Sequence, residues 1–150
     1  MHKLGAVLLL ATIITAGVAF AQGASSTASG QLVPVGTRTL NLRCEGLGSP
    51  TVIFEAGLGD GSINFRSLQS RVARFTRACA YDRAGYGMSE AGPLPRDMTA
   101  LVSDLESLLV AAAEPGPYVL AGHSFGGLIA LDFANRNGGL VRGVVLIDSS

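Results

Sequence analysis

The sequence has little positive charge and few histidines. Its 150 residues include one lysine, two histidines and no tryptophan. Eleven basic side chains are balanced by eleven acidic ones, so the formal net charge at pH 7 is zero. Because there is no basic excess, neither nucleic acid nor an anionic surface is expected as the main partner.

The sequence also lacks a complete nucleotide-binding fingerprint. Gly85 and Gly87 follow a strand-like run, and glycines at this spacing can cradle a phosphate group. A dinucleotide fingerprint would need a helix that opens directly at the next glycine, but Pro93 and Pro95 intervene here. We therefore expect no cofactor, and we expect no metal site.

The amino-terminal segment is typical of a secretory signal. After a short positive start, residues 4–20 are apolar or small throughout, and residues 19–21, Ala-Phe-Ala, fit a signal-peptidase site. We expect residues 1–21 to be a signal peptide and the mature protein to be secreted or periplasmic. The alternative is an uncleaved membrane anchor, the one case in which a membrane would be a partner. Residues 22–30 are small and polar, as in a flexible linker.

Two cysteines, Cys44 and Cys79, follow this segment. In an exported chain a disulfide between them can persist, and two reduced, buried cysteines are the alternative. On the chain-entropy model, a bridge that closes this span would stabilise the fold by up to about 4 kcal/mol where the geometry permits it.

Strand-like and helix-like runs alternate from residue 51 onward. The strand-like runs are short and apolar: 51–54, 79–81, 118–121 and 143–148. The helix-like runs have helical periodicity: 64–75, 99–113 and 128–135. In the first helix-like run the predicted buried stripe is Phe65, Leu68, Val72 and Phe75. Two further strand-like runs, 32–35 and 39–44, come before them. This order predicts a parallel sheet with helices on both faces, and ligands in such sheets bind at the carboxyl ends of the strands.

A serine framed by glycines stands between the strand-like run 118–121 and the helix that follows it. Gly122, Ser124 and Gly126 form a Gly-x-Ser-x-Gly motif, which in this context predicts a nucleophile elbow. A sharp strand-to-helix turn strains the backbone of its central residue, and glycines two positions away on either side remove the collisions that side chains would cause. The motif therefore predicts that Ser124 is the attacking group and that the Phe125 amide points toward the same space.

With its motifs in this order, the sequence resembles the α/β-hydrolase family over residues 31–150. The matching motifs follow the third, fourth and fifth strands: 55–59, 82–89 and 122–127. The resemblance implies an α/β fold with a mostly parallel sheet, of which this sequence would be the amino-terminal part, truncated after the sixth strand. In the family, the loop equivalent to residues 82–89 is usually structural and braces the site.

The family resemblance also implies roles for individual residues. Ser124 would be the nucleophile, and the backbone amides of Leu58 and Phe125 would form the oxyanion hole. Many members have a His-Gly pair where this sequence has Ala56-Gly57, a departure that leaves the hole intact because the donor is a backbone amide. The second strand would lie antiparallel beside the fourth, which would place the two cysteines near one another.

The base that a serine nucleophile requires is missing from the motifs. His123 neighbours Ser124 in sequence, so its side chain should project away from the serine hydroxyl. In hydrolases of this type the acid and the histidine follow the serine, but only Asp132 and Asp148 follow Ser124 and no histidine does. Asp148 is a candidate acid, although related chains more often carry the acid one strand later. We expect residues 1–150 to be part of a longer hydrolase, with the histidine and acid downstream of residue 150, and to show no efficient turnover alone.

The predicted function is that of a secreted serine hydrolase that cleaves a small-molecule carboxylic ester, or less typically an amide, through an acyl-enzyme. The alternatives are a non-catalytic binding protein on the same scaffold and a lyase that shares the elbow. A dehalogenase or an epoxide hydrolase is disfavoured, because those members attack with an aspartate at the elbow. Candidate residues for an apolar pocket, which are also typical of a core, are Leu58, Ile63, Phe65 and Phe125.

Overall fold

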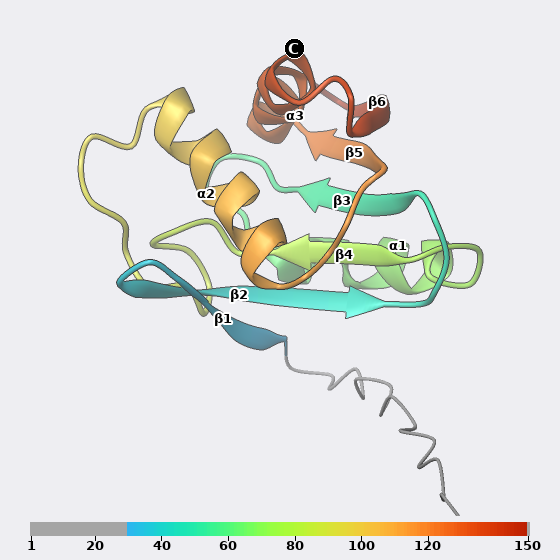
Figure 1. The fold of residues 1–150 in the computed structure, drawn as a ribbon, viewed down its shortest axis with the longest axis horizontal. Helices are drawn as coiled ribbons and strands as arrows, with labels where there is room; N and C mark the ends of the chain where they lie inside the picture. Colours follow the sequence, from blue (N-terminus) through green and yellow to red (C-terminus); the bar gives the residue numbers. More distant parts are fainter. Residues whose placement is uncertain (1–29, 150) are drawn as a thin grey trace, which may run out of the picture.

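The computed structural model describes residues 30–149, which form one six-stranded sheet with helices on both faces (Figure 1). The strands are β1 (Gln31–Val35), β2 (Arg38–Glu45), β3 (Thr51–Glu55), β4 (Ala78–Tyr81), β5 (Tyr118–His123) and β6 (Val141–Ile147). The helices are the 3₁₀ turn η1 (Ser62–Phe65), α1 (Arg66–Val72), α2 (Met98–Ala111) and α3 (Phe125–Arg136). The predicted signal peptide, residues 1–21, and all of the predicted linker except Gly30 lie outside the described residues.

The strands lie in the order β1-β2-β4-β3-β5-β6. β2 pairs antiparallel with both β1 and β4, whereas β4, β3, β5 and β6 pair parallel with one another. The carboxyl ends of the four parallel strands therefore meet at one edge of the sheet. The predicted mostly parallel sheet, with its second strand antiparallel beside the fourth, is confirmed.

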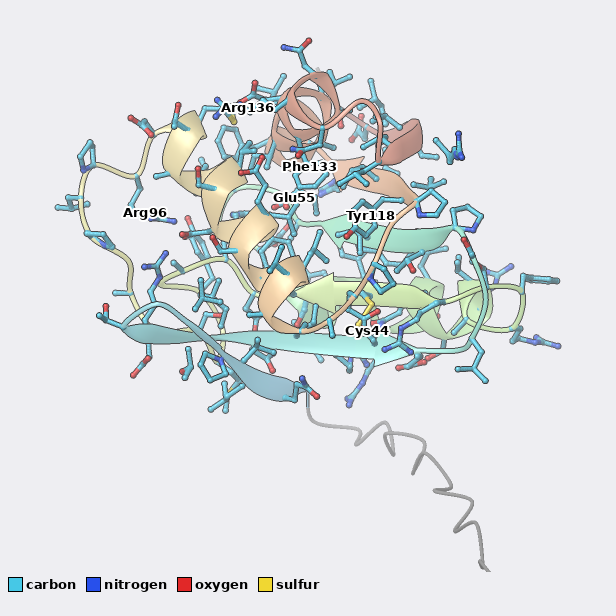
Figure 2. All side chains as sticks on the ribbon, viewed as in Figure 1. Cys44, Glu55, Arg96, Tyr118, Phe133 and Arg136 are labelled. Atoms are coloured by element: carbon cyan, nitrogen blue, oxygen red, sulfur yellow. A yellow bond between two sulfur atoms is a disulfide. The ribbon has the colours of Figure 1, made fainter. Side chains whose placement is uncertain are left out.

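One face of the sheet is covered by α2 and α3 and the other by η1 and α1 (Figure 1). Between α2, α3 and the sheet lies the larger core, where the Tyr118 and Phe133 rings meet edge to face at 6.1 Å (Figure 2). On the opposite face, the rings of Phe54 and Phe65 stack at 4.9 Å. Each face thus has its own apolar cluster, and burial of these side chains is the main force that holds the helices against the sheet.

The helix α2 follows the sequence pattern closely. Its predicted stripe is Leu101, Val102, Leu105, Leu108, Leu109 and Ala112. The first five are each at most 8% exposed, whereas Ala112 is half-buried. The helix begins one residue earlier than the predicted Thr99, because the Asp97 carboxylate accepts a hydrogen bond of 2.9 Å from the Ala100 amide and caps the first turn.

The prediction of one helix over 64–75 was wrong in length and in its buried face. A 3₁₀ turn comes first, α1 ends at Val72, and Phe75 is 87% exposed. The buried position on α1 is held by Gln69, which is fully buried and donates from Nε2 to the carbonyls of Arg43 at 2.7 Å and Ala78 at 2.9 Å. Gln69 thus pins α1 to the sheet through hydrogen bonds, so the helix does not need an apolar residue there.

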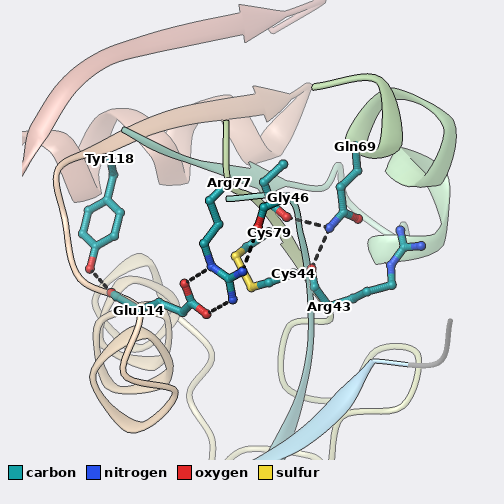
Figure 3. Close-up of a disulfide and its surroundings, with 9 residues drawn as sticks. Arg43, Cys44, Gly46, Gln69, Arg77, Cys79, Glu114 and Tyr118 are labelled. Carbon is teal, nitrogen blue, oxygen red and sulfur yellow. Dashed lines mark hydrogen bonds and ion pairs between the residues drawn. A yellow bond between two sulfur atoms is a disulfide. The ribbon is translucent and has the colours of Figure 1, made fainter. Parts of the chain in front are cut away.

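A disulfide joins Cys44 of β2 to Cys79 of β4 (Figure 3). The two residues are direct partners in the antiparallel register between these strands. Cys79 is fully buried and Cys44 is half-buried, so the bridge is largely shielded from solvent. The pairing implied by the family resemblance is therefore present.

The strand β6 forms one edge of the described sheet. Val145 is 49% exposed and Leu146 is 48% exposed, so the strand is not covered on both faces as its apolar sequence suggests. Among residues 30–149, none of the helices combines the length and the apolar character that a membrane span requires.

Candidate active site

Ser124 lies at the sharp joint between β5 and α3. Its backbone has φ 49° and ψ −123°, a conformation that residues with a side chain rarely adopt and that costs about 1–3 kcal/mol. The Ser124 amide donates to the Ile147 carbonyl of β6 at 3.1 Å, which ties the joint to the neighbouring strand. The side chain is half-buried, and no described residue hydrogen bonds its hydroxyl. This is the local geometry that the elbow motif predicts.

The two elbow glycines, Gly122 and Gly126, stand where a side chain would collide with neighbouring backbone atoms. A Cβ on Gly122 would lie 2.5 Å from the Gly126 carbonyl oxygen and 2.6 Å from the Gly127 backbone. A Cβ on Gly126 would lie 2.5 Å from the Ala56 carbonyl oxygen and closer still to that of Glu55. Because all of these neighbours are backbone atoms, they cannot move aside cheaply. Gly126 therefore lets the start of α3 pack directly against the segment that follows β3.

The proposed oxyanion donors are both free of other acceptors. Phe125 is the first residue of α3, where amides have no partner within the helix and the helix dipole favours negative charge. Leu58 follows β3 in an exposed loop, and its side chain is 72% exposed. In the part of the chain that the structure describes, no group accepts a hydrogen bond from either amide. The contact between Gly126 and the Glu55 and Ala56 carbonyls brings the two donor segments together.

A buried ionic network lies directly behind the loop that carries Leu58. Glu55 is fully buried and Arg83 is 3% exposed. Arg83 Nη1 donates to Glu55 Oε1 at 2.7 Å, and the Tyr81 hydroxyl donates to the other carboxylate oxygen. The same guanidinium donates to the Ala56 and Gly57 carbonyls, each at 2.5 Å. This network holds the start of the loop by its backbone.

Burial and charge shift the pKa of all three groups in the network. Burial raises the pKa of Glu55 above its ordinary value, and the Arg83 charge and the hydrogen bonds from Tyr81 and Arg83 offset this only in part. Burial lowers the pKa of Arg83, but the Glu55 charge and its hydrogen bond more than offset this, so the pKa of Arg83 lies above its ordinary value. Burial raises the pKa of the Tyr81 hydroxyl well above its ordinary value, and the Glu55 charge raises it further. Arg83 thus remains a cation and Tyr81 remains a donor throughout the neutral pH range.

The loop 82–89 is organised around a second buried carboxylate. Asp82 accepts hydrogen bonds from the Ser62 amide at 2.7 Å, Asn41 Nδ2 at 2.8 Å and the Met88 amide at 3.0 Å. Burial would raise the pKa of Asp82, but these hydrogen bonds outweigh it and lower the pKa below its ordinary value. Gly87 has φ 51°, and a Cβ there would collide with this carboxylate. The loop 82–89 therefore braces residues 56–61 through η1, as the family resemblance implies. Residues 56–61 carry Leu58 and are called the oxyanion loop below, after the predicted role of its amide.

Comparison with known proteins places this geometry in a family. The family model of the thioesterase domain matches residues 50–150, about two thirds of the chain. The chain belongs to the thioesterase domain family.

Several relatives of this thioesterase-domain chain have curated descriptions. It is 36% identical over 104 residues to the uncharacterized protein YqjL of Bacillus subtilis, a match that covers 69% of this chain and 41% of that protein. It is 34% identical over 117 residues to the 2-(acetamidomethylene)succinate hydrolase of Mesorhizobium japonicum, with 77% of this chain and 41% of that enzyme covered. The chain thus spans about two fifths of the length of these relatives.

Solved structures share the fold. A thermophilic esterase from Thermogutta terrifontis aligns with a TM-score of 0.72 at 24% identity, over 82% of this chain and 46% of that one. The enol-lactonase from Burkholderia xenovorans aligns with a TM-score of 0.74 at 23% identity, over 80% and 47%. The predicted α/β-hydrolase fold of the thioesterase-domain chain is therefore confirmed.

His123 lies on the side of the oxyanion loop. Its Nδ1 is 3.7 Å from Asp60 Oδ2, and a Cβ on Gly57 would lie 3.0 Å from the same Nδ1. No hydrogen bond joins it to Ser124 among the described residues. In this thioesterase-domain chain His123 contacts the loop and is not placed as the base for its sequence neighbour.

The two acids that follow the elbow differ in their surroundings. Asp132 is ion-paired with Arg136 one turn later in α3, at 2.7 Å, so it is engaged in the helix. Asp148 is exposed immediately after β6 and has φ 46°, at the carboxyl edge of the sheet. Of the two, only Asp148 lies, like Ser124, directly after the carboxyl end of a parallel strand.

A cavity of about 500 Å³ opens beside the oxyanion loop. Its lining includes Gly59, Asp60, Ile63, Tyr86 and Met88, but neither Ser124 nor Phe125. Because the cavity does not reach the elbow, we assign the site by the backbone geometry of Ser124 and not by the position of the cavity. Of the four predicted pocket residues, Ile63 lines this cavity, whereas Phe65 is buried in the core.

The described residues contain one cluster with metal-binding side chains close enough to share an ion: Cys44, Cys79 and Glu114. The two sulfur atoms are bonded to one another, and Glu114 is ion-paired with Arg77. These ligand atoms are already engaged, so we assign no metal site to the cluster.

The Glu55, Tyr81 and Arg83 network was missed at the sequence level. Glu55 ends an apolar strand and Arg83 begins the next loop, 28 positions later. A charged residue at the end of a strand covered on both faces needs a partner, and this is the signal that could have linked the two.

Proposed function

We propose that this protein is a serine hydrolase that cleaves a small-molecule acyl ester, with an oxygen or sulfur leaving group, through an acyl-enzyme. The observation that supports it best is the strained backbone of Ser124 at the joint of β5 and α3, opposite a loop with an unpaired amide. Strain of this kind persists only where the surrounding structure enforces it, and it is typical of catalytic groups. Matches to hydrolases add support.

In the proposed reaction, Ser124 Oγ attacks the carbonyl carbon of the substrate and its proton passes to a base. The amides of Leu58 and Phe125 stabilise the negative charge that develops on the carbonyl oxygen. The alcohol or thiol leaves with a proton from the base, and an acyl-serine ester remains. Water then attacks this ester, releases the carboxylic acid and restores the serine hydroxyl.

We propose that the base and its orienting acid come from outside residues 30–149. His123, the only histidine within that range, contacts the oxyanion loop instead of Ser124. In α/β hydrolases with a serine nucleophile, the acid and histidine follow the serine in the chain. Residues 1–150 alone are therefore expected to show no efficient turnover. Ester hydrolysis by residues 1–150 at the same rate as by the full-length protein would contradict this. Export through residues 1–21 remains part of the proposal.

The test uses the full-length protein with p-nitrophenyl butyrate and a butyryl thioester as substrates. A fluorophosphonate should label Ser124 covalently, and Ser124→Ala should abolish labelling and lower kcat by about 10⁴-fold or more. His123→Ala serves as a matched control at the neighbouring position, and it should keep the label on Ser124.

Each result separates the alternatives. Turnover that survives Ser124→Ala would overturn the proposal. A wild-type protein that neither hydrolyses these esters nor reacts with the phosphonate would instead favour a non-catalytic binding protein. Labelling without ester hydrolysis would favour a lyase on the same scaffold.

A further inference from the structure

Arg83 clamps two consecutive carbonyls of the loop that leads to Leu58. Its Nη1 donates to the Ala56 carbonyl and its Nη2 to the Gly57 carbonyl, while Nη1 also donates to Glu55 Oε1. All of these groups are buried, so water does not compete for the carbonyls. One side chain therefore holds the direction of both carbonyl groups, and the Asp60 amide adds a hydrogen bond of 3.2 Å to the Gly57 carbonyl.

The Gly57 carbonyl shares a peptide plane with the Leu58 amide. The cis peptide bonds among the described residues are all at X-Pro positions, so the Gly57–Leu58 bond is trans. In a planar trans peptide the carbonyl oxygen and the amide hydrogen point in opposite directions. Because Arg83 holds the oxygen on the buried side, the Leu58 N–H must point to the other side of the loop, where it has no acceptor among the described residues.

The clamp is itself held in place. Glu55 receives hydrogen bonds from both Arg83 and the Tyr81 hydroxyl, and the Arg83 guanidinium lies 5.0 Å from the centre of the Tyr86 ring. A planar fork with several donors can satisfy a carboxylate and two carbonyls together. A lysine ammonium, a single point charge on a flexible stem, cannot reproduce this geometry.

We propose that Arg83 is a positioning residue that aims the Leu58 amide at the developing oxyanion, with Glu55 and Tyr81 as its supports. This inference rests on the proposed hydrolase function. Arg83 does not touch the reacting atoms. It acts through the orientation of one peptide plane, so its loss weakens binding of the transition state and leaves binding of the ground-state substrate unchanged.

The test compares Arg83→Lys with Arg77→Lys in the full-length protein. Arg77 is a matched control because it also pairs with a buried carboxylate, Glu114, and donates to a backbone carbonyl, that of Gly46 at 3.1 Å. It lies near the disulfide, at the other end of the strands (Figure 3). Arg83→Lys should lower kcat by about 100-fold with KM within about threefold of wild type. Arg77→Lys should leave kcat unchanged.

A second readout reports on the oxyanion hole directly. A boronic acid that forms a tetrahedral adduct with Ser124 should lose affinity in Arg83→Lys by the same factor as kcat, because both depend on the Leu58 amide. Tyr81→Phe loosens the clamp without removing its cation and should lower kcat about fivefold, the effect of one hydrogen bond. This variant keeps the proposal testable if Arg83→Lys does not fold.

The possible outcomes point to different conclusions. If the wild-type protein hydrolyses esters and Arg83→Lys or Tyr81→Phe keeps its kcat, the positioning role is overturned while the proposed function stands. An equal loss of kcat in Arg77→Lys also overturns it, since the effect would then reflect general loosening of the fold. A wild-type protein without turnover or Ser124 labelling overturns the hydrolase function and the positioning role together.

Discussion

The two ends of the parallel strands are built differently. At the amino ends, covalent and polar contacts close the structure: the Cys44–Cys79 disulfide joins β2 to β4, and Gln69 satisfies carbonyls from both of these strands (Figure 3). At the carboxyl ends, Ser124 is held at positive φ, and the Leu58 amide has no acceptor among the described residues. One end satisfies its backbone groups, and the other leaves donors available.

This difference separates stability from reactivity in space. Contacts at the amino ends stabilise the folded state, and they lie at the end of the strands opposite to Ser124. Strain and unpaired donors at the carboxyl ends lower stability, which proteins tolerate where function requires it. Three substitutions of decreasing effect test whether the two ends are independent.

The largest effect is expected at the amino ends. Replacing both Cys44 and Cys79 with alanine should lower the free energy of unfolding of the full-length protein by about 4 kcal/mol, because the bridge closes a span of 35 residues in the unfolded chain. Urea denaturation measures this change, and added reductant should affect the wild type only. The folded variant should still react with a fluorophosphonate at the wild-type rate, and a slower reaction would show that the two ends are coupled.

A smaller loss is expected at the elbow. Gly126→Ala should lower the free energy of unfolding by about 3 kcal/mol, because its Cβ would collide with the Glu55 and Ala56 carbonyls. It should also lower the rate of phosphonate labelling, since α3 would shift away from the oxyanion loop. Gly143→Ala is the matched control, because a Cβ there has no neighbour within 4 Å. Equal denaturation midpoints for the two variants would contradict the close packing of the elbow.

The smallest effect is a gain. Ser124→Gly should be about 1 kcal/mol more stable than Ser124→Ala, because glycine adopts φ 49° without strain, and this gain exceeds its extra entropy in the unfolded chain. Both variants lack the hydroxyl and should be inactive, so the comparison isolates the backbone. Thermal unfolding provides the measurement. If alanine at this position is as stable as glycine, the elbow carries no strain.

The features whose signal lies within one short segment of the chain were predictable from sequence. The apolar runs before Glu55 and Gly122 are strands, and the stripe on α2 is buried, because burial imposes a period that one chain segment displays by itself. The elbow was also predictable from a short segment. The residues that avoid its steric clashes, Gly122 and Gly126, flank Ser124 within five residues.

Features that depend on distant partners were not predictable. Gln69 takes the buried place on α1 only because carbonyls from β2 and β4 converge on it, and its own neighbours in sequence do not reveal this. By contrast, the cap of α2 is a local feature, since Asp97 lies two residues before the predicted start at Thr99 and accepts from Ala100. Arg83 meets Glu55 across 28 positions, a pairing that no local period records.

The Arg83 clamp limits how freely this loop can be transplanted. Residues 55–59 look like a portable module, yet the direction of the Leu58 amide depends on a side chain from another strand end. A designer who moved only the loop into a new scaffold would transfer the donor without the part that aims it. The transferable unit is the pair of strand ends, with the arginine included.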